Sequence, residues 1–427
     1  MKKLLLIQTA GLGYDFVTRN GVREIGGLEV RPMRTVFPAL TCTAQATLRT
    51  GLPPAQHGLP ANGFFDAVLR KPWFWEQSSA LVQGPRIWEA FRARGGTVAL
   101  AFFQQSLGET VDQIVSPAPI HTHGGGMLLG CYSKPDNLFA RMTRSVGRPF
   151  RLRHYWGPLA SVKSSEWIAD AVSGLLSAPD SPDLCVTYLP GLDYDLQRFG
   201  PHHPKSVKAL ATVRSELERL FAAARANGYE AVAFGDYAIT EVTRGAVFPN
   251  RALYEAGLFA VRRVKGMSYP DFHQSAAYAL PDHQIAMVTC FVPDALPRVA
   301  DLLRALDGVA QVLDRTQQAA LEVDHPRTGD LLLVAQPGRW FAYPWWQDAR
   351  EAPDYARHVD IHSKPGYDPC ELFFGRTPLS VSLDTAKVKG THGLAGAGNE
   401  TARLSTLPLK SESLSELACE LRAWLNS

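Results

Sequence analysis

The sequence has no marked excess of charge of either sign. Its 427 residues include 44 Lys and Arg against 41 Asp and Glu, which leaves a formal net charge of +3. A protein that binds nucleic acid through its phosphates usually presents a strongly basic surface. The near balance therefore gives no electrostatic case for a nucleic-acid partner, and we expect none.

Closely spaced cysteines are also missing. The six cysteines are scattered along the chain, with no Cys-x-x-Cys spacing: Cys42, Cys131, Cys185, Cys290, Cys370 and Cys419. Several stand in apolar stretches, where a thiol behaves as a small hydrophobic side chain. This distribution argues against a disulfide framework and favours a reducing compartment, so we predict a cytoplasmic protein.

Long apolar runs are absent as well, and none approaches the length that a membrane span requires. The N-terminal apolar run, 4–7, stops at Gln8 and is too short for the core of a secretion signal. We therefore interpret this run as the first buried strand and expect no membrane partner.

The sequence does contain an alternation of strand-like apolar runs and helical periodicity. The strand-like runs are 4–7, 97–103, 184–189 and 231–234, and the helical patterns are 42–50, 164–176 and 206–227. Such alternation is typical of an α/β sandwich around a mostly parallel sheet. A sheet of this kind binds its ligands at the carboxyl ends of its strands.

The pattern changes between about 276 and 343. Strand-like runs at 285–292, 309–313 and 331–334 and a helical run at 296–305 follow one another there. We predict a small α/β subdomain at 276–343, inserted into a core formed by 1–275 and 344–427. A second, loop-rich insertion is predicted at about 74–157, whose His-Thr-His-Gly-Gly-Gly tract at 121–126 is compatible with a lid or with a plain surface loop.

One segment carries the clearest chemical pattern. Thr41 precedes a short helical run that ends at Gly51, a residue suited to a C-terminal cap, and Pro53 and Pro54 stop any continuation. A hydroxyl at a helix N-terminus near the open edge of a sheet meets unpaired N–H groups and a positive dipole end, which outlines a phosphate site. The alternative is a threonine that only caps its helix.

Around Thr41 runs the pattern Pro-x-x-Thr-x-x-x-x-x-Thr-x-x-Thr-Gly, followed by Pro-x-x-His-Gly and an Asn. Its positions are Pro38, Thr41, Thr47, Thr50, Gly51, Pro54, His57, Gly58 and Asn62. This set resembles the nucleophile segment of the alkaline phosphatase superfamily, in particular its nucleotide pyrophosphatase/phosphodiesterase branch. The resemblance implies an alkaline phosphatase-like α/β/α sandwich in which Thr41 attacks phosphorus and Asn62 holds a phosphoryl oxygen.

The same resemblance extends to positions that bind metal in the family. Asp193 and Asp236 each follow a strand-like run, and His392 belongs to a closing His-Gly pair. The resemblance therefore implies one or two divalent metal ions, zinc before others, held by these three residues.

Three positions depart from the family pattern. Ala10 stands where the family has an Asp, and Gln197 and Tyr237 stand where it has His. An amide or a phenol is a poor zinc ligand, and a threonine hydroxyl needs a metal or a base to become a good nucleophile. Asp360 and His362 are our candidates for replacement ligands, because residues two apart share one face of a strand.

Other residues carry weaker hypotheses. The pairs at 282–283 and 324–325 join an Asp to a His and offer further metal donors, with ordinary loop histidines as the alternative. The tryptophans at 73, 75 and 340–346 suit either an aromatic clamp or core packing, and we favour packing.

Substrate contacts are predicted at Gln197, Tyr237 and Lys364, which lie in or beside the candidate site loops. Arg49 and Arg198 are further candidates for holding a phosphate oxygen, and solvated surface residues are the alternative for both.

These patterns favour a metal-dependent enzyme that hydrolyses phosphodiester or pyrophosphate bonds in a small phosphorylated substrate. The three replaced ligand positions favour an alternative of a different class, a metal-poor protein that binds a phosphorylated ligand without hydrolysing it. A third possibility, implied by the wider superfamily, is the hydrolysis of a sulfate or a phosphonate.

Overall fold

The computed structural model describes residues 1–121, 127–128, 130–377 and 380–427. The predicted lid tract lies outside the described residues from position 122 to 126. None of the described helices combines the length and the apolar character that a bilayer crossing requires.

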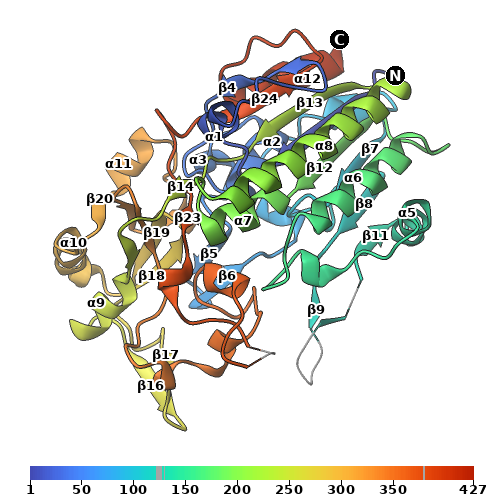
Figure 1. Ribbon diagram of the computed structural model, residues 1–427. Helices are drawn as coiled ribbons and strands as arrows, with labels where there is room; N and C mark the ends of the chain where they lie inside the picture. The colour runs from blue at the N-terminus through green and yellow to red at the C-terminus, as the bar shows by residue number, and fades with distance from the viewer. Residues whose placement is uncertain (122–126, 129, 378–379) are drawn as a thin grey trace.

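An eight-stranded sheet forms the centre of the molecule (Figure 1). Its order is β11 (Tyr132–Lys134), β8 (Gln113–Ser116), β7 (Val98–Ala101), β12 (Leu184–Leu189), β1 (Leu4–Thr9), β13 (Glu230–Gly235), β24 (Thr401–Ser405) and β4 (Arg31–Met33). The strands from β8 to β13 are parallel, while β11, β24 and β4 pair antiparallel at the two edges. Every residue of β1 and β12 is buried, as expected for continuous apolar strands covered on both faces. The predicted α/β class with a mostly parallel sheet is confirmed.

The register of the central strands fixes where the site lies. Thr9 at the end of β1 pairs with Leu189 at the end of β12 and with Gly235 at the end of β13. The three strands therefore end level with one another. The residues that follow them meet at one edge of the sheet, as predicted for a ligand site in this class of fold.

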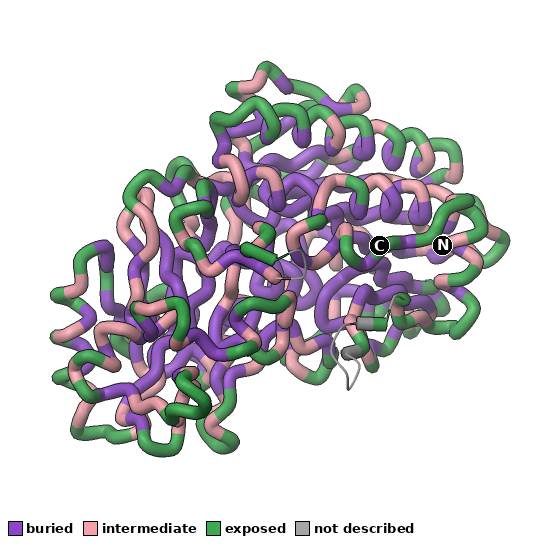
Figure 2. Tube along the Cα trace, turned by 60° about the horizontal axis from the view of Figure 1, so that its bottom comes forward, coloured by how far each residue is buried: buried purple, intermediate pink, exposed green. Residues whose placement is uncertain are grey.

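Helices cover the sheet (Figure 1). The helices α6 (Lys163–Leu176), α7 (Gly191–Phe199) and α8 (Pro204–Ala226) pack against one another, and α6 and α8 contact β12 and β13. Buried positions recur every three or four residues along α8, which explains its helical pattern in the sequence. Figure 2 shows this alternation of buried and exposed residues along the outer helices. By contrast, every residue of α2 (Thr41–Thr50) is buried, and α2 packs against α12 (Leu414–Asn426).

A second, four-stranded sheet has the order β18 (Ala277–Asp282), β19 (Ile285–Cys290), β21 (Leu331–Ala335) and β20 (Val309–Leu313), and α10 (Leu296–Arg304) packs on β20. These elements fall inside the predicted unit at 276–343. Their apolar core also includes residues from 40–82 and 345–361, so the boundaries of a separate subdomain stay a prediction.

The segment 74–157 differs from its prediction as a loop-rich insertion. It supplies β7, β8 and β11 to the main sheet, together with α5 (Leu138–Val146). Of these strands, β7 was predicted from the apolar run at 97–103. β8 and β11 have only four and three residues, which is too short for a clear strand pattern.

The remaining elements are short. They are α1 (Tyr14–Arg19), α3 (Pro54–His57), α4 (Glu89–Ala93), α9 (Pro249–Glu255) and α11 (Arg315–Ala320), with the strand pairs β2 (Glu24–Ile25) and β3 (Leu28–Glu29), β5 (Gly63–Asp66) and β6 (Lys71–Phe74), β9 (Ile120–His121) and β10 (Met127–Leu128), β14 (Thr240–Glu241) and β23 (Gly390–Thr391), β15 (Gly245–Val247) and β22 (Arg339–Phe341), and β16 (Val261–Val264) and β17 (Met267–Pro270).

Candidate functional site

Thr41 is the first residue of α2 and lines a cavity at the carboxyl edge of the main sheet. The N-cap position belongs to Leu40, whose backbone is extended and whose side chain makes no capping bond. The Thr41 hydroxyl instead lies 3.4 Å from the hydroxyl of Tyr188. A role limited to helix capping is therefore not what the structure shows.

The residues that follow α2 form the loop that brings Asn62 to the site. Gly51 ends α2 in the left-handed conformation, with φ +70°, as its position in the sequence predicted. His57 Nε2 lies 3.0 Å from the Thr47 hydroxyl and ties this loop back to the helix. Asn62 then accepts the Cys42 N–H through Oδ1 at 3.0 Å, and so satisfies one of the unpaired amides of the α2 N-terminus.

Asn62 is held by the turn between β18 and β19. Asp282 accepts the Asn62 backbone N–H at 2.9 Å and one hydrogen of Asn62 Nδ2 at 3.3 Å. The Nδ2 group carries two hydrogens, so one is left for a ligand oxygen. The next residue, His283, lines the cavity and has φ +59°, a left-handed conformation that is uncommon among non-glycine residues. The sequence indicated Asp282 and His283 as possible metal donors, but it did not predict that they lie beside Asn62 and Thr41.

Asp193 receives hydrogen bonds from two of the replaced family positions. Gln197 lies one turn later on α7 and donates from Nε2 to Asp193 Oδ2 at 2.5 Å. Tyr237 donates its hydroxyl to Asp193 Oδ1 at 3.0 Å, and the Tyr237 hydroxyl also interacts with Thr41. Both oxygens of this carboxylate therefore have a neutral donor.

Asp236 lies directly after β13 and is fully buried. Its Oδ1 accepts the backbone N–H groups of Gly11 at 3.1 Å and Tyr237 at 3.0 Å. Its Oδ2 accepts Gln8 Nε2 at 3.0 Å. The carboxylate thus joins the ends of β1 and β13 and makes contacts typical of a structural buried acid.

His392 belongs to a row of stacked rings. Its ring lies parallel to that of Tyr237 with centroids 3.5 Å apart, and 3.7 Å from the ring of His283. His283 stacks in turn on Tyr367 at 4.2 Å. His392 Nδ1 donates to the Ala39 carbonyl at 2.9 Å, which fixes the ring orientation.

Burial dominates the electrostatics of these groups. Desolvation raises the pKa of Asp193 and of Asp282 to about 7 and that of Asp236 to about 8, although hydrogen-bond donors lower all three. It also lowers the pKa of His392 to about 3, and moves the pKa of His283 in the same direction. At neutral pH the two imidazoles are therefore uncharged, and burial disfavours the charged form of all three carboxyl groups.

The cavity has a volume of about 50 Å³. Its walls combine aromatic rings with a few polar groups: Thr41, Asn62, Trp75, Gln104, Tyr155, Trp156, Tyr188, Pro190, Asp193, Tyr194, Gln197, Tyr237, His283, Tyr367 and His392. None of these described lining residues is Lys or Arg. The space suits a small reacting group rather than a whole drug-sized ligand, for which pockets are usually at least about 300 Å³.

Asp360 and Lys364 lie instead at a second cavity of about 50 Å³, which shares aromatic walls such as Trp75 and Trp156 with the first. The segment 360–362 is a turn and not the strand-like spacing we predicted. Asp360 Oδ1 accepts the backbone N–H groups of His362 and Ser363, a local bond that favours a turn over a strand.

His362 and Lys364 make structural contacts at this turn. His362 Nδ1 lies 2.9 Å from the carbonyl oxygen of Phe74. The Lys364 ammonium is buried between Asp368 at 2.8 Å and Glu371 at 2.6 Å. These carboxylates raise the Lys364 pKa, so the lysine keeps its charge inside this ion cluster.

Other residues that the sequence singled out also have structural contacts. Arg198 donates to three backbone carbonyls, and His325 caps a short 3-10 turn. Trp340 and Trp345 are almost fully buried, which agrees with packing.

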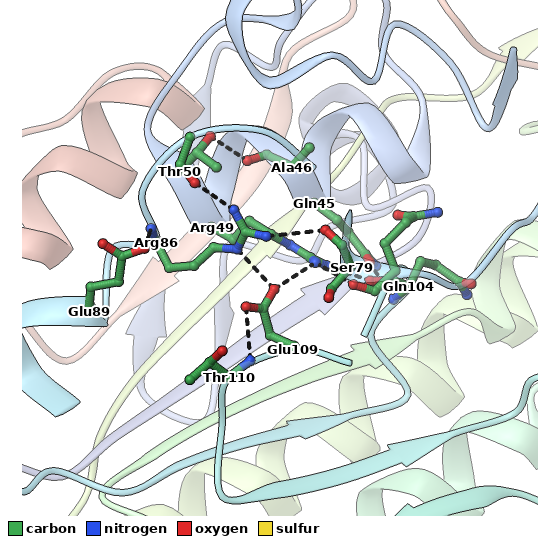
Figure 3. Close-up of polar contacts among 12 residues, drawn as sticks. Gln45, Ala46, Arg49, Thr50, Ser79, Arg86, Glu89, Gln104, Glu109 and Thr110 are labelled. Carbon is green, nitrogen blue, oxygen red and sulfur yellow. Dashed lines mark hydrogen bonds and ion pairs between the residues drawn. The ribbon is translucent and has the colours of Figure 1, made fainter. Parts of the chain in front are cut away.

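Arg49 is buried rather than on the surface, and it does not line the cavity (Figure 3). Its guanidinium is fully buried, donates to the Gln104 and Gln105 carbonyls, and lies 3.7 Å from Glu109. Gln104 is also held from α2 by Gln45, whose Oε1 accepts the Gln104 backbone N–H at 2.7 Å. The helix α2 therefore positions the loop that supplies Gln104 to the cavity wall.

Only two of the predicted metal ligands, Asp193 and His392, line the first cavity. Asp236 is not among its described lining residues, and Asp360 lies at the second cavity with His362 beside it in the same turn. Within the described residues no three His, Cys, Asp or Glu side chains are placed to share one metal ion. The donor set therefore does not fit the zinc pair that the resemblance implied.

Comparisons with known proteins agree with the fold. A sequence model for a family described as Type I phosphodiesterase / nucleotide pyrophosphatase matches residues 18–368. A search of curated protein sequences gives no significant match.

Solved structures resemble the whole chain. Phosphonoacetate hydrolase from Sinorhizobium meliloti 1021, in complex with phosphonoformate, is 16% identical with a TM-score of 0.63, over 100% of this chain and 96% of that one. Murine ectonucleotide pyrophosphatase / phosphodiesterase 5 is 16% identical with a TM-score of 0.58, over 100% and 95%. An inactive threonine-to-alanine variant of the murine protein, in complex with AMP, gives 15% and 0.58 with the same coverage. The predicted alkaline phosphatase-like fold is confirmed.

Proposed function

Because the chain belongs to the type I phosphodiesterase / nucleotide pyrophosphatase family, a family of hydrolases, we propose that it hydrolyses a phosphodiester or pyrophosphate bond with Thr41 as its nucleophile. The position of the Thr41 hydroxyl carries the proposal. It stands at the N-terminus of a fully buried helix, faces the cavity and takes no part in capping. A phosphoryl group beside it would meet the positive end of the helix dipole.

Asn62 is proposed to orient the phosphoryl group. Asp282 and the Cys42 N–H fix its amide, and the second hydrogen of Nδ2 is left to donate to a phosphoryl oxygen. Such a fixed donor costs no reorganisation during the reaction. The rest of a small phosphorylated substrate would extend along Trp75 and Trp156 toward the second cavity.

The divalent metal implied by the resemblance is not part of this proposal, because the donor set does not fit it. In its absence the proton of the attacking Thr41 hydroxyl would pass to Asp193 through the Tyr237 hydroxyl, which interacts with both residues, and the leaving group would depart with the P–O bond that breaks. A second candidate function also keeps its place: binding of a phosphorylated ligand without hydrolysis. The hydrogen bonds from Gln197 and Tyr237 to Asp193 favour it, since they occupy the carboxylate on which the family's metal chemistry depends.

The test is turnover of a chromogenic phosphodiester, bis(p-nitrophenyl) phosphate, with a phosphonate screened beside it. Replacing Thr41→Ala should lower kcat by at least about a thousandfold, as the removal of a covalent nucleophile does. Thr41→Ser keeps the hydroxyl and should retain most of the activity.

Thr43→Ala is the matched control. Thr43 is buried on the same helix, its hydroxyl has no hydrogen-bond partner among the described residues, and it is not among the described residues that line the cavity. Its variant should keep wild-type turnover. Tight binding of AMP by a wild-type protein that turns over none of these substrates would instead support the second candidate.

A further inference from the structure

The residues at two of the replaced family positions do not merely lack a metal-binding group, because they also form hydrogen bonds to a remaining ligand. Gln197 and Tyr237 stand where the family has zinc-binding histidines, and both side chains donate to Asp193, one to each carboxylate oxygen. A histidine nitrogen in those places would offer a lone pair to a metal. An amide N–H and a phenol O–H offer hydrogens instead, so they compete with a cation for the lone pairs of the same carboxylate.

The carboxylate of Asp236 is likewise occupied by hydrogen-bond donors of the protein. Asp236 accepts the backbone N–H groups of Gly11 and Tyr237 on one oxygen and Gln8 Nε2 on the other. Beside it, Ala10 supplies a fully buried methyl group where the family has a further carboxylate. A metal ion here would have to displace protein donors already at hydrogen-bond distance, without the third carboxylate that would compensate its charge.

Tyr237 also fixes His392, the one histidine of the family's metal ligands that this chain keeps. The ring of Tyr237 lies parallel to that of His392 at 3.5 Å, while His392 Nδ1 donates to Ala39. Tyr237 thus touches Asp193, Thr41 and His392 at once. One side chain occupies the space between the nucleophile and two of the remaining family ligands.

We propose that Gln197 and Tyr237 take the place of the zinc ions as partners of Asp193, so that the Thr41 site binds its substrate without a divalent metal. The proposal rests on the proposed function for the identity of the site. It carries a consequence for the ligand. With no metal ion, and with no Lys or Arg among the described lining residues, the cavity favours a phosphoryl group of low charge, a diester rather than a dianionic monoester.

The decisive experiment is elemental analysis of the full-length wild-type protein after incubation with zinc, manganese or magnesium and removal of free metal. We expect no stoichiometric metal. The variant A10D/Q197H/Y237H restores the family's residues at all three positions and should retain zinc. Zinc held by the wild-type protein at one or two ions per chain, and lost in Asp193→Asn, would overturn the proposal.

Calorimetric titration with zinc supplies a second readout should the triple variant fail to fold. Wild-type protein should give no saturable heat, whereas a saturable heat that is absent in Asp193→Asn would count against the proposal. Neither measurement depends on turnover. If the proposed hydrolysis is wrong, the protein will be inactive with every substrate and every metal tested. The measurement of metal binding can still be interpreted in that case.

Discussion

At the scale of single residues, Tyr237 determines the character of the site. It replaces a potential metal ligand with a hydroxyl that serves Asp193 and Thr41, and its ring supports His392. Asp193 depends on this hydroxyl because a buried carboxylate oxygen without a donor carries its full desolvation penalty.

Tyr237→Phe should therefore lower the free energy of unfolding by about 1–3 kcal/mol, the cost of leaving a buried polar atom unpaired, while the ring stack on His392 survives. Urea denaturation measures the change. Tyr188→Phe is the control, because Tyr188 contacts Thr41 but does not bond to Asp193. Equal losses in the two variants would contradict the importance of the Asp193 bond.

Among the elements, α2 positions both Thr41 and a part of the cavity wall. Thr41 stands at its N-terminus, and Arg49 near its C-terminus holds the loop after β7. That loop places Phe102 and Gln105 at positive φ, +61° and +46°. Such conformations cost energy for non-glycine residues and persist because other contacts hold them.

Arg49→Lys should lower the free energy of unfolding by about 2–3 kcal/mol, because a lysine cannot satisfy two carbonyls and Glu109 with one planar fork. It should also raise KM more than it lowers kcat, since Gln104 lines the cavity without touching Thr41 in the described contacts. Arg92→Lys is the control, because the Arg92–Asp112 pair is partly exposed and worth at most about 1 kcal/mol. A similar loss in both variants would contradict the role assigned to Arg49.

At the scale of the whole molecule, two apolar cores meet around the site. The core of the main sheet contains Leu48 of α2, and the core of the smaller sheet contains Cys42 and Ala46 of the same helix. The turn at 282–283 then closes the cavity from the side of the smaller sheet. The site is therefore buried deeply enough to perturb the carboxyl groups inside it.

The pH dependence of stability should reveal this burial. Burial raises the pKa of Asp236 from 3.8 to about 8, so its contribution to stability is complete below pH 3.8 and is lost as pH rises toward 8. Asp236→Asn removes this loss. Its stability relative to wild type should rise across that window by up to about 1.4 kcal/mol per pH unit.

Thermal unfolding from pH 5 to about pH 9, well within the range where most domains stay folded, measures this difference. The Gln8 amide can turn over to serve the new Asn, because Gln8 Oε1 has no hydrogen-bond partner among the described residues. Asp301→Asn, at an exposed helix position, is the control for the loss of an acidic residue. A constant difference between Asp236→Asn and wild type at all pH values would refute the buried titration.

Several core elements, and the position of Thr41 at the start of a helix, could be predicted from the sequence. The strand at 184–189 and the helices near 42–50 and 164–176 were predicted almost to the residue, because apolar periodicity is a local property of the chain. Strand-end reasoning also put Thr41 and Asp193 at one edge of the sheet. The resemblance of the segment around Thr41 indicated the family, which the match over residues 18–368 confirms.

The meaning of the departures from the family pattern depends on contacts between distant parts of the chain. Tyr237 reaches Asp193 across 44 residues of sequence, and Asp282 reaches Asn62 across 220. Arg49 looked like a surface or phosphate-binding residue until the fold buried it beside Glu109. Contacts of this range depend on how the two sheets pack around α2, and side-chain chemistry read along the chain carries no information about that packing.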